Sequence, residues 1–273
     1  MGKIVAGYGT AHIMMARHSA GERGERVFAG MKDIGQRIRA LEPDLAIIIS
    51  SDHMYNYSLD MQPPFALATD DAFVPFGDMD LPKEAFPGHA GFADGLMQAS
   101  SEAYFDLTRL TNYRPDHGVI LPYLMMSPQR TLPAVPLIIN TSCDPVPPLR
   151  RAWQLGEIIA AFCRDKRPAQ ERIVVVGTGG LSHWLGVPEL GKTNPQFDHA
   201  VMDAILSGHG KNLTAWSQEK VRAEGGNGGQ EILNWVCMAA ALGPSVKGER
   251  IYYEDIPEWV TGMGGLELRP IAA

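Results

Sequence analysis

The sequence predicts an α/β fold in which a central, mostly parallel sheet is flanked by helices. Short apolar runs typical of buried strands alternate along the chain with amphipathic stretches of helical periodicity. This alternation favours parallel strands joined by helical crossovers. The chain has 273 residues and shows no convincing boundary between two units, so residues 1–273 are expected to form a single domain.

Four apolar runs are the expected strands of the sheet. They span residues 3–7, 45–50, 134–140 and 172–177, and the last of these, RIVVVG, is the strongest. Proline cannot donate a hydrogen bond to a neighbouring strand. The third run contains Pro136 and is therefore expected at a sheet edge or with an irregular start.

Three stretches are expected to be helices. Residues 24–41 repeat apolar side chains at helical spacing, residues 148–163 begin with a proline suited to a first turn, and residues 230–242 follow a glycine-rich turn. Residues 63–88 are rich in Pro, Asp and Phe and are expected to form a long functional loop.

Composition excludes several classes of function. A formal charge of −7 argues against a basic surface that binds nucleic acid and disfavours binding to an anionic membrane surface. No apolar run approaches about 18 residues, so no membrane span is expected. Three widely spaced cysteines exclude a disulfide framework and a CxxC motif. Together with the lack of an apolar signal segment at the N-terminus, they favour a cytoplasmic protein.

One motif match is misleading. Residues 186–193 fit the phosphate-binding pattern GxxxxGK followed by Ser or Thr. A phosphate-binding loop follows its strand directly and opens a helix. Here His183 and Trp184 intervene after the strand, and Pro195 lies where the helix should propagate. Nucleotide binding is therefore disfavoured.

Three of the eight histidines follow the ends of predicted strands. His12 follows the first strand, His53 follows the second, and His183 follows the strongest strand in the sequence GTGGLSH. Ligands in open α/β sheets bind outside the carboxyl ends of strands, so these imidazoles are expected to converge on one cleft. Taken singly, a histidine after a strand is more often an ordinary loop residue than a ligand.

A metal site built from neutral imidazoles usually includes a carboxylate. Glu231 is the best candidate because it opens an apolar helix, although the helix dipole alone also favours an acid there. Asp52 precedes His53 and is a second candidate, either as ligand or as a partner that orients an imidazole. Asp116 is expected to cap the helix that follows it. Candidates for substrate contact are Tyr8, Thr10, Asp52 and Tyr55, with ordinary loop packing as the alternative.

Six segments, in one order over nearly the whole chain, carry a resemblance to a known family. They are the early His12, SDH at 51–53 before MQPPF, PDHG at 115–118, GTGGLSH at 177–183, GQE at 229–231, and IPEWVTGMG at 256–264. The chain resembles the class III, LigB-type extradiol ring-cleavage dioxygenases. It is similar to 2,3-dihydroxyphenylpropionate dioxygenase and to the catalytic subunits of protocatechuate 4,5-dioxygenase and gallate dioxygenase.

The resemblance implies roles for five residues on a LigB-like domain. His12, His53 and Glu231 would bind a non-haem Fe(2+), and His117 and His183 would form an acid/base pair. Two imidazoles and one carboxylate on one face of Fe(II) leave positions for the two oxygens of a catechol and for O2. We assign proton abstraction to His183 and the acid role to His117, although the sequence is equally consistent with the reverse.

Departures from the family leave the substrate and partners open. The chain is shorter than the dihydroxyphenylpropionate enzymes between His199 and Glu231, and it carries Trp-Leu-Gly at 184–186 where that branch has a proline-rich turn. The ring is expected to be dihydroxyphenylpropionate-like, protocatechuate- or gallate-like, or a dihydroxypyridine or hydroxypyridone. The chain lacks the helical lid of the protocatechuate and gallate enzymes, so the resemblance implies a homo-oligomer or a small lid subunit.

Two other classes of function compete with this interpretation. One is a zinc-dependent hydrolase on the same scaffold, which the metal identity and a lack of O2 consumption would reveal. The other is a non-enzymatic binding module. The presence of all five site residues argues against a binding module, because it needs neither a metal triad nor an acid/base pair.

Overall fold

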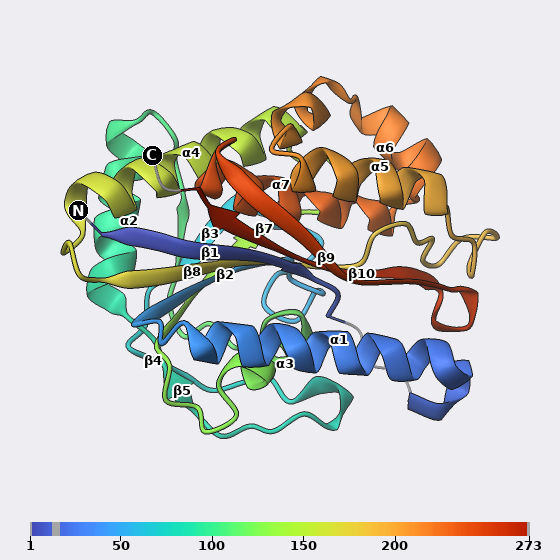
Figure 1. The fold of residues 1–273 in the computed structure, drawn as a ribbon. Coiled ribbons are helices and arrows are strands. Elements are labelled where there is room, and N and C mark those ends of the chain that lie inside the picture. Colours follow the sequence, from blue (N-terminus) through green and yellow to red (C-terminus); the bar gives the residue numbers. More distant parts are fainter. Residues whose placement is uncertain (1, 13–16, 272–273) are drawn as a thin grey trace.

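A large twisted sheet forms the centre of the molecule (Figure 1). The structure is a computed structural model and describes residues 2–12 and 17–271, without the side chains of residues 17 and 18. Within these residues the main sheet has eight strands in the order β6-β3-β7-β2-β8-β1-β10-β9. In chain order they are β1 (Lys3–Thr10), β2 (Leu45–Ser50), β3 (Phe65–Ala68), β6 (Thr108–Leu110), β7 (Ala134–Ile139), β8 (Arg172–Thr178), β9 (Val246–Ile256) and β10 (Thr261–Pro270).

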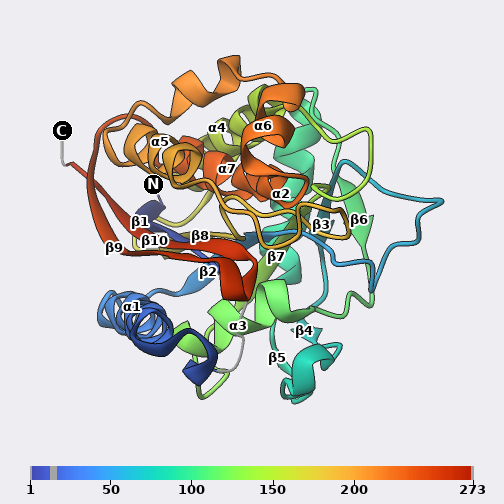
Figure 2. The same ribbon diagram turned by 90° about the vertical axis from the view of Figure 1, so that its right-hand side faces the viewer.

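The middle of the sheet is parallel, as predicted. Strands β7, β2, β8 and β1 pair in parallel, and β3 pairs in parallel with β6. Antiparallel pairs occur toward both edges, where β10 joins β1 to β9 and where β3 joins β7. The four central strands β7, β2, β8 and β1 therefore all end along one edge, and Figure 2 looks toward that edge.

Helices cover both faces of the sheet (Figures 1 and 2). Helices α1 (Gly21–Ala40) and α3 (His117–Met126) cover one face. The opposite face is covered mainly by α2 (Ala90–Glu102), α4 (Leu149–Lys166), α5 (Pro195–Leu206) and α7 (Ile232–Leu242), with α6 (Gln218–Gly225) beside them. In the described part of the chain, no helix combines the length and apolar character needed to cross a bilayer.

The predicted strands and helices are all present, with small shifts at their ends. Strand β2 has the predicted bounds, β1 and β8 extend beyond them, and α1 begins three residues before the predicted start. The expectation for Pro136 is corrected, because β7 lies inside the sheet between β3 and β2. Strand β3 pairs only with Leu137–Ile139, so the missing N–H of Pro136 breaks no bond to β3.

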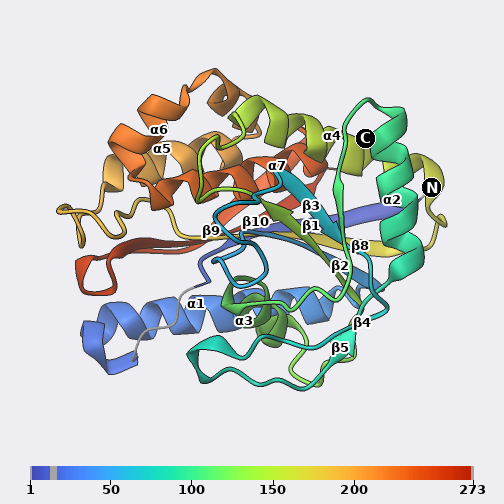
Figure 3. The same ribbon diagram turned by 180° about the vertical axis from the view of Figure 1, so that it is seen from behind.

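The stretch expected as one long loop is partly strand. It contains β3 of the main sheet and the small hairpin of β4 (Ala72–Phe73) and β5 (Phe86–Pro87). Figure 3 shows this hairpin segment beside α3. The remainder, residues 74–85, contains a single short helical turn at Asp78–Asp80.

Helix α7 packs very close to the sheet because the strands present glycines to it. A Cβ atom on Gly9 would lie 2.6 Å from Trp235, and one on Gly177 would lie 2.7 Å from the carbonyl of Asn234. This close approach brings the amino-terminal end of α7, and Glu231 just before it, to the ends of β1 and β8.

Candidate active site

Five polar side chains converge where the parallel strands end. His12 follows β1, His53 follows β2 and His183 follows β8, while Glu231 precedes α7 and His117 begins α3. The three strand-end histidines thus lie at the same edge of the sheet, as their positions in the sequence predicted.

Glu231 is the centre of this cluster. Its Oε1 lies 3.3 Å from Nε2 of His12 and 3.4 Å from Nε2 of His53. Its Oε2 accepts a hydrogen bond from the backbone N–H of Gly180 at 2.6 Å and lies 4.0 Å from Nε2 of His183. Gly179 allows this approach, because a Cβ atom there would lie 2.7 Å from Cβ of Glu231.

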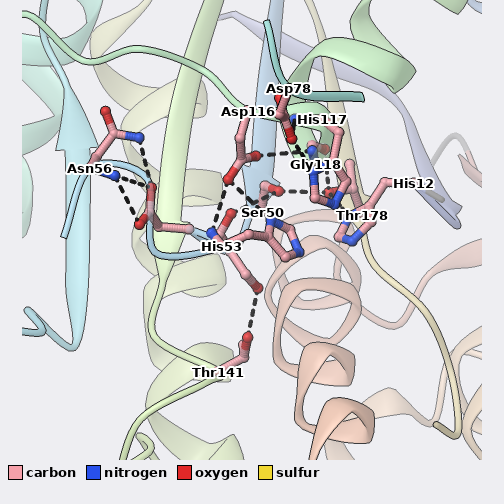
Figure 4. Close-up of polar contacts among 12 residues, drawn as sticks. His12, Ser50, His53, Asn56, Asp78, Asp116, His117, Gly118, Thr141 and Thr178 are labelled. Atoms are coloured by element: carbon pink, nitrogen blue, oxygen red, sulfur yellow. Dashed lines mark hydrogen bonds and ion pairs between the residues drawn. The ribbon is translucent and has the colours of Figure 1, made fainter. Parts of the chain in front are cut away.

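The Nδ1 atoms of the two imidazoles are bonded to groups other than Glu231 (Figure 4). Nδ1 of His53 lies 3.0 Å from Oδ2 of Asp116, which as a carboxylate only accepts, so Nδ1 carries the proton. Nδ1 of His12 lies 3.2 Å from the hydroxyl of Thr178, whose own proton goes to the carbonyl of Gly118 at 2.9 Å. Both rings therefore direct Nε2 toward Glu231, the nitrogen that an imidazole oriented in this way offers to a metal ion.

The donor set and its spacing fit a metal ion. Ligand bonds of about 2.1 Å at right angles separate neighbouring ligand atoms by about 3.0 Å, close to the two observed distances. Ligand atoms of His12, His53 and His117 also lie within 4.8 Å of one another. Two imidazoles and a carboxylate suit a divalent transition metal, and the bonds to Asp116 and Thr178 are the kind that orient ligating histidines.

The electrostatics also favour a cation. Glu231 is 6% exposed, Asp116 is fully buried and the Asp78 side chain is 5% exposed, so three carboxylates share one buried region. Burial opposes ionisation of Glu231, but His12 and His53 outweigh it and hold its pKa well below the usual value. Burial likewise opposes protonation of His53, yet Asp116 and Glu231 raise its pKa to about 10. Without a metal ion, protonated imidazole thus supplies the positive charge that this region needs.

His117 and His183 lie beside this group, His117 next to His53 and His183 next to Glu231. The rings of His117 and His53 are 4.0 Å apart between centroids. His183 is 2% exposed, and its Nδ1 lies 3.0 Å from the carbonyl of Leu181, which fixes its proton on Nδ1. Burial lowers the pKa of His183 and also lowers the pKa of His117, to about 4. Both imidazoles are therefore held neutral, with Nε2 able to accept a proton.

The expectation that Tyr8 and Thr10 contact substrate is corrected. Side chains alternate along β1, and Gly7 and Gly9 face α7, so Tyr8 and Thr10 face the side of α1. The hydroxyl of Tyr8 donates to Glu267 at 2.6 Å, and that of Thr10 lies 3.0 Å from the hydroxyl of Tyr252. Neither hydroxyl points into the histidine cluster.

Asp52 and Tyr55 differ in what the structure allows them to do. The carboxylate of Asp52 accepts bonds from the backbone N–H groups of Asn56 and Tyr57 and from the Asn56 amide, so it stabilises the turn after His53. Tyr55 is 41% exposed and stacks on Phe76, with ring centroids 4.3 Å apart. Of these two residues, Tyr55 is the one with a side chain that is accessible to a substrate.

Sequence reasoning missed two carboxylates that orient histidines. Asp116 caps α3 as predicted, because its Oδ1 accepts from the N–H of Gly118 at 2.9 Å, but its Oδ2 also binds His53. Asp78 bonds to Nδ1 of His117 at 2.5 Å. The position of Asp116 next to His117 was a usable signal, whereas nothing local distinguishes Asp78 from the other acids of its loop.

The segment that matches the phosphate-binding pattern does not form a nucleotide site. Residues 186–193 form mostly exposed turns, and α5 begins only at Pro195 after its cap Asn194. The four remaining histidines do not belong to the cluster as far as the structure describes them. His89 caps α2, His199 stacks on Tyr253 and His209 is exposed, while the side chain of His18 lies outside the described residues.

A cluster of imidazoles and carboxylates at the carboxyl ends of parallel strands defines a metal-dependent α/β enzyme. Residues 7–264 match the family model described as the catalytic LigB subunit of aromatic ring-opening dioxygenase. The chain belongs to this LigB family and is a ring-cleavage dioxygenase, which confirms the resemblance seen in the sequence.

Individual relatives agree with this assignment. Proteins named 2,3-dihydroxyphenylpropionate/2,3-dihydroxicinnamic acid 1,2-dioxygenase are similar over most of their length. The one from Photorhabdus laumondii is 25% identical, covering 88% of this chain and 89% of the relative. The one from Cupriavidus necator is 28% identical, covering 91% of each. The crystal structure of an uncharacterized Escherichia coli K12 protein, JW3007, shares the fold with a TM-score of 0.62 at 14% identity, covering 96% of this chain and 99% of that one.

Proposed function

We propose that this protein is a non-haem Fe(II)-dependent extradiol dioxygenase that opens a catechol-type ring next to the diol in the catabolism of aromatic compounds. One observation carries the proposal. Oε1 of Glu231 lies within 3.4 Å of Nε2 on both His12 and His53, whose Nδ1 atoms are already bonded. These three residues would hold the iron, which supplies the centre through which the diol and O2 react.

The two remaining histidines would move protons. Because Nδ1 of His183 donates to a carbonyl, its Nε2 is free to take a proton from the diol. His117 would act as the acid. Asp78, 2.5 Å from Nδ1 of His117, would stabilise the imidazolium formed when Nε2 gains a proton, which supports this assignment over the reverse.

The substrate ring is proposed from the relatives and the rim of the site. The names of the relatives favour a 2,3-dihydroxyphenylpropionate-like ring; a protocatechuate- or gallate-like ring and a hydroxypyridone are the other candidates. Tyr55 is proposed to contact the substrate, since it is accessible and follows His53. A cytoplasmic location, a homo-oligomer and a small lid subunit stay predictions.

The decisive experiment is O2 uptake by anaerobically purified, Fe(II)-loaded protein. The panel would hold 2,3-dihydroxyphenylpropionate, protocatechuate, gallate, catechol, 2-aminophenol and 3-hydroxy-4-pyridone, with spectra recorded for ring-opened product. We expect uptake with one or two of these compounds and a ring-opened semialdehyde product. Such a result would establish both the reaction and the substrate branch.

The alternatives predict different results. A zinc-dependent hydrolase would bind zinc in preference to iron and consume no O2. A binding module would bind an aromatic compound without iron and without turnover. The proposed function would be overturned if the iron-free protein does not bind added iron and takes up no O2 with any compound of the panel.

A further inference from the structure

The carboxylate of Asp78, 39 residues earlier in the chain, bonds to His117. Asp78 lies in the segment between β4 and β5, and its Oδ2 is 2.5 Å from Nδ1 of His117 (Figure 4). The same oxygen lies 3.3 Å from the backbone nitrogen of His117. The Asp78 side chain is 5% exposed and that of His117 is 12% exposed, so water competes little for this contact.

The arrangement repeats the one that holds His53. Oδ2 of Asp116 accepts from the backbone N–H of His53 at 2.9 Å and from its Nδ1 at 3.0 Å. In both pairs a single carboxylate oxygen binds the main chain and the ring of the same histidine. Two contacts from one oxygen fix the ring plane as well as the position of the proton.

The loop is bonded to the residues that precede α3, and these bonds keep Asp78 in place. The backbone N–H of Phe76 donates to the carbonyl of Pro115 at 2.8 Å, and the Arg114 guanidinium donates to the carbonyl of Phe76 at 3.3 Å. Gly77, Met79 and Asp80 then adopt left-handed backbone angles, with φ of 83°, 52° and 58°. For Met79 and Asp80 this conformation is unfavourable and must be maintained by the surrounding contacts.

We propose that Asp78 is a positioning residue that holds His117 in the tautomer with its proton on Nδ1 and points Nε2 at the reacting groups. The inference rests on the proposed acid role of His117. The contacts of the Asp78 carboxylate are with the backbone nitrogen and Nδ1 of His117, so Asp78 would act through His117. Its loss should therefore slow turnover while leaving metal binding intact.

The test compares Asp78→Asn with Asp80→Asn. The first change keeps the shape of the side chain and removes its charge, and the second removes an exposed charge from the same turn. We expect Asp78→Asn to lower kcat about 10- to 100-fold, with KM and iron content unchanged, and Asp80→Asn to match the wild type. Asp78→Glu, which keeps the carboxylate, should recover part of kcat and serves as the second variant if Asp78→Asn does not fold.

A double-mutant cycle separates positioning from a general structural effect. In a His117→Gln background, Asp78→Asn should cause no further fall in kcat, because the group through which Asp78 acts is gone. Equal falls of kcat in both backgrounds would overturn the proposal. So would a loss of iron from Asp78→Asn, or wild-type kcat in that variant.

A second readout does not depend on turnover. In metal-free protein labelled with ¹⁵N-histidine, the Nδ1 proton of His117 should give a strongly downfield ¹H signal, assigned by its absence in His117→Gln. The signal should vanish in Asp78→Asn and persist in Asp80→Asn. If the wild type opens no ring, the proposed function fails, while this signal still decides whether Asp78 sets the tautomer. A signal unchanged in Asp78→Asn would overturn the inference.

Discussion

At the scale of single residues, one carboxylate oxygen of Glu231 lies within 3.4 Å of two imidazole nitrogens. We expect Glu231→Gln to lower Fe(II) affinity by at least about tenfold, because the amide keeps the shape but loses the charge that offsets a divalent cation. Iron content after anaerobic reconstitution and equilibrium titration measure the effect. Glu189→Gln, an exposed acid on the loop after His183, is the control and should retain full iron content. Retained affinity in Glu231→Gln would remove Glu231 from the ligand set.

Gly228 controls the space around His183. A Cβ atom on Gly228 would lie 2.0 Å from Nε2 of His183, and the buried ring has little room to retreat. We expect Gly228→Ala to reduce kcat by roughly 100-fold with iron retained, since small misplacements of a reacting group cost about that much. His183→Ala should likewise keep iron and lose turnover.

The control for this substitution is Gly91→Ala in α2, where the nearest atom would be 3.8 Å away. Steady-state O2 uptake and iron content of the three variants decide the outcome. Near-normal turnover in Gly228→Ala would show that the ring of His183 does not need its present position.

At the scale of elements, the crossing of α4 and α7 fixes where Glu231 lies. Gly156 of α4 meets α7 so closely that a Cβ atom would lie 2.2 Å from the carbonyl of Cys237. The obstacle is backbone, which cannot rotate away. We expect Gly156→Ala to destabilise the fold by about 1–3 kcal/mol, despite the gain in helix propensity of about 0.5–1 kcal/mol.

Urea unfolding at constant m-value measures this change. Gly91→Ala again provides the comparison, because it adds a methyl group to a helix without a clash and should not destabilise the protein. A Gly156→Ala protein as stable as the wild type would show that α7 can shift away from α4, and Fe(II) affinity would then report whether Glu231 moved with it.

The elements that sequence predicted best are those whose pattern is purely local. Strand β2 (LAIIIS) is buried on both faces and was predicted with its observed bounds. Strands β9 and β10 were not predicted. Most residues of β9 are exposed or half-buried, β10 is interrupted by glycines, and the pairing of both strands is decided by distant neighbours. The positions of His12, His53 and His183 after three predicted strands were enough to predict that they lie close together, since parallel strands end at one edge.

The directions of side chains and the contacts between distant residues could not be predicted from the sequence. Tyr8 lies near His12 in the chain, but the alternation along β1 turns it toward Glu267. Asp78 reaches His117 across a sequence separation of 39 residues, through a loop whose path depends on packing against α3. Neither outcome follows from composition or periodicity.

At the scale of the whole molecule, a buried carboxylate joins three parts of the fold. Asp198 on α5 accepts bonds from the backbone N–H of Ser182 at 2.7 Å, from the Ser182 hydroxyl at 3.0 Å and from the hydroxyl of Tyr253 on β9 at 2.9 Å. A Cβ atom on Gly262 of β10 would lie 2.0 Å from its Oδ2. Asp198 thus links α5 and β9 to the loop that ends in His183.

This linkage makes the stability of the fold depend on pH. Burial, aided by the nearby charge of Asp255, raises the pKa of Asp198 from 3.8 to about 6, although the hydrogen bonds of Tyr253 and Ser182 oppose the shift. Between those values the folded protein holds a proton that the unfolded chain has released. The contribution of Asp198 to stability is therefore complete below about pH 4 and is lost as the pH rises through about 6, with a slope of at most about 1.4 kcal/mol per pH unit.

Asp198→Asn should remove this slope, because the amide does not titrate. We expect the difference in unfolding free energy between variant and wild type to shift in favour of the variant as the pH rises from 4 to 6.5, and to level off above that. Urea unfolding at closely spaced pH values measures it, with the exposed Asp60→Asn as the matched control that should follow the wild type throughout. If the difference for Asp198→Asn stays constant with pH, Asp198 is ionised across this range, and its three hydrogen bonds outweigh its burial.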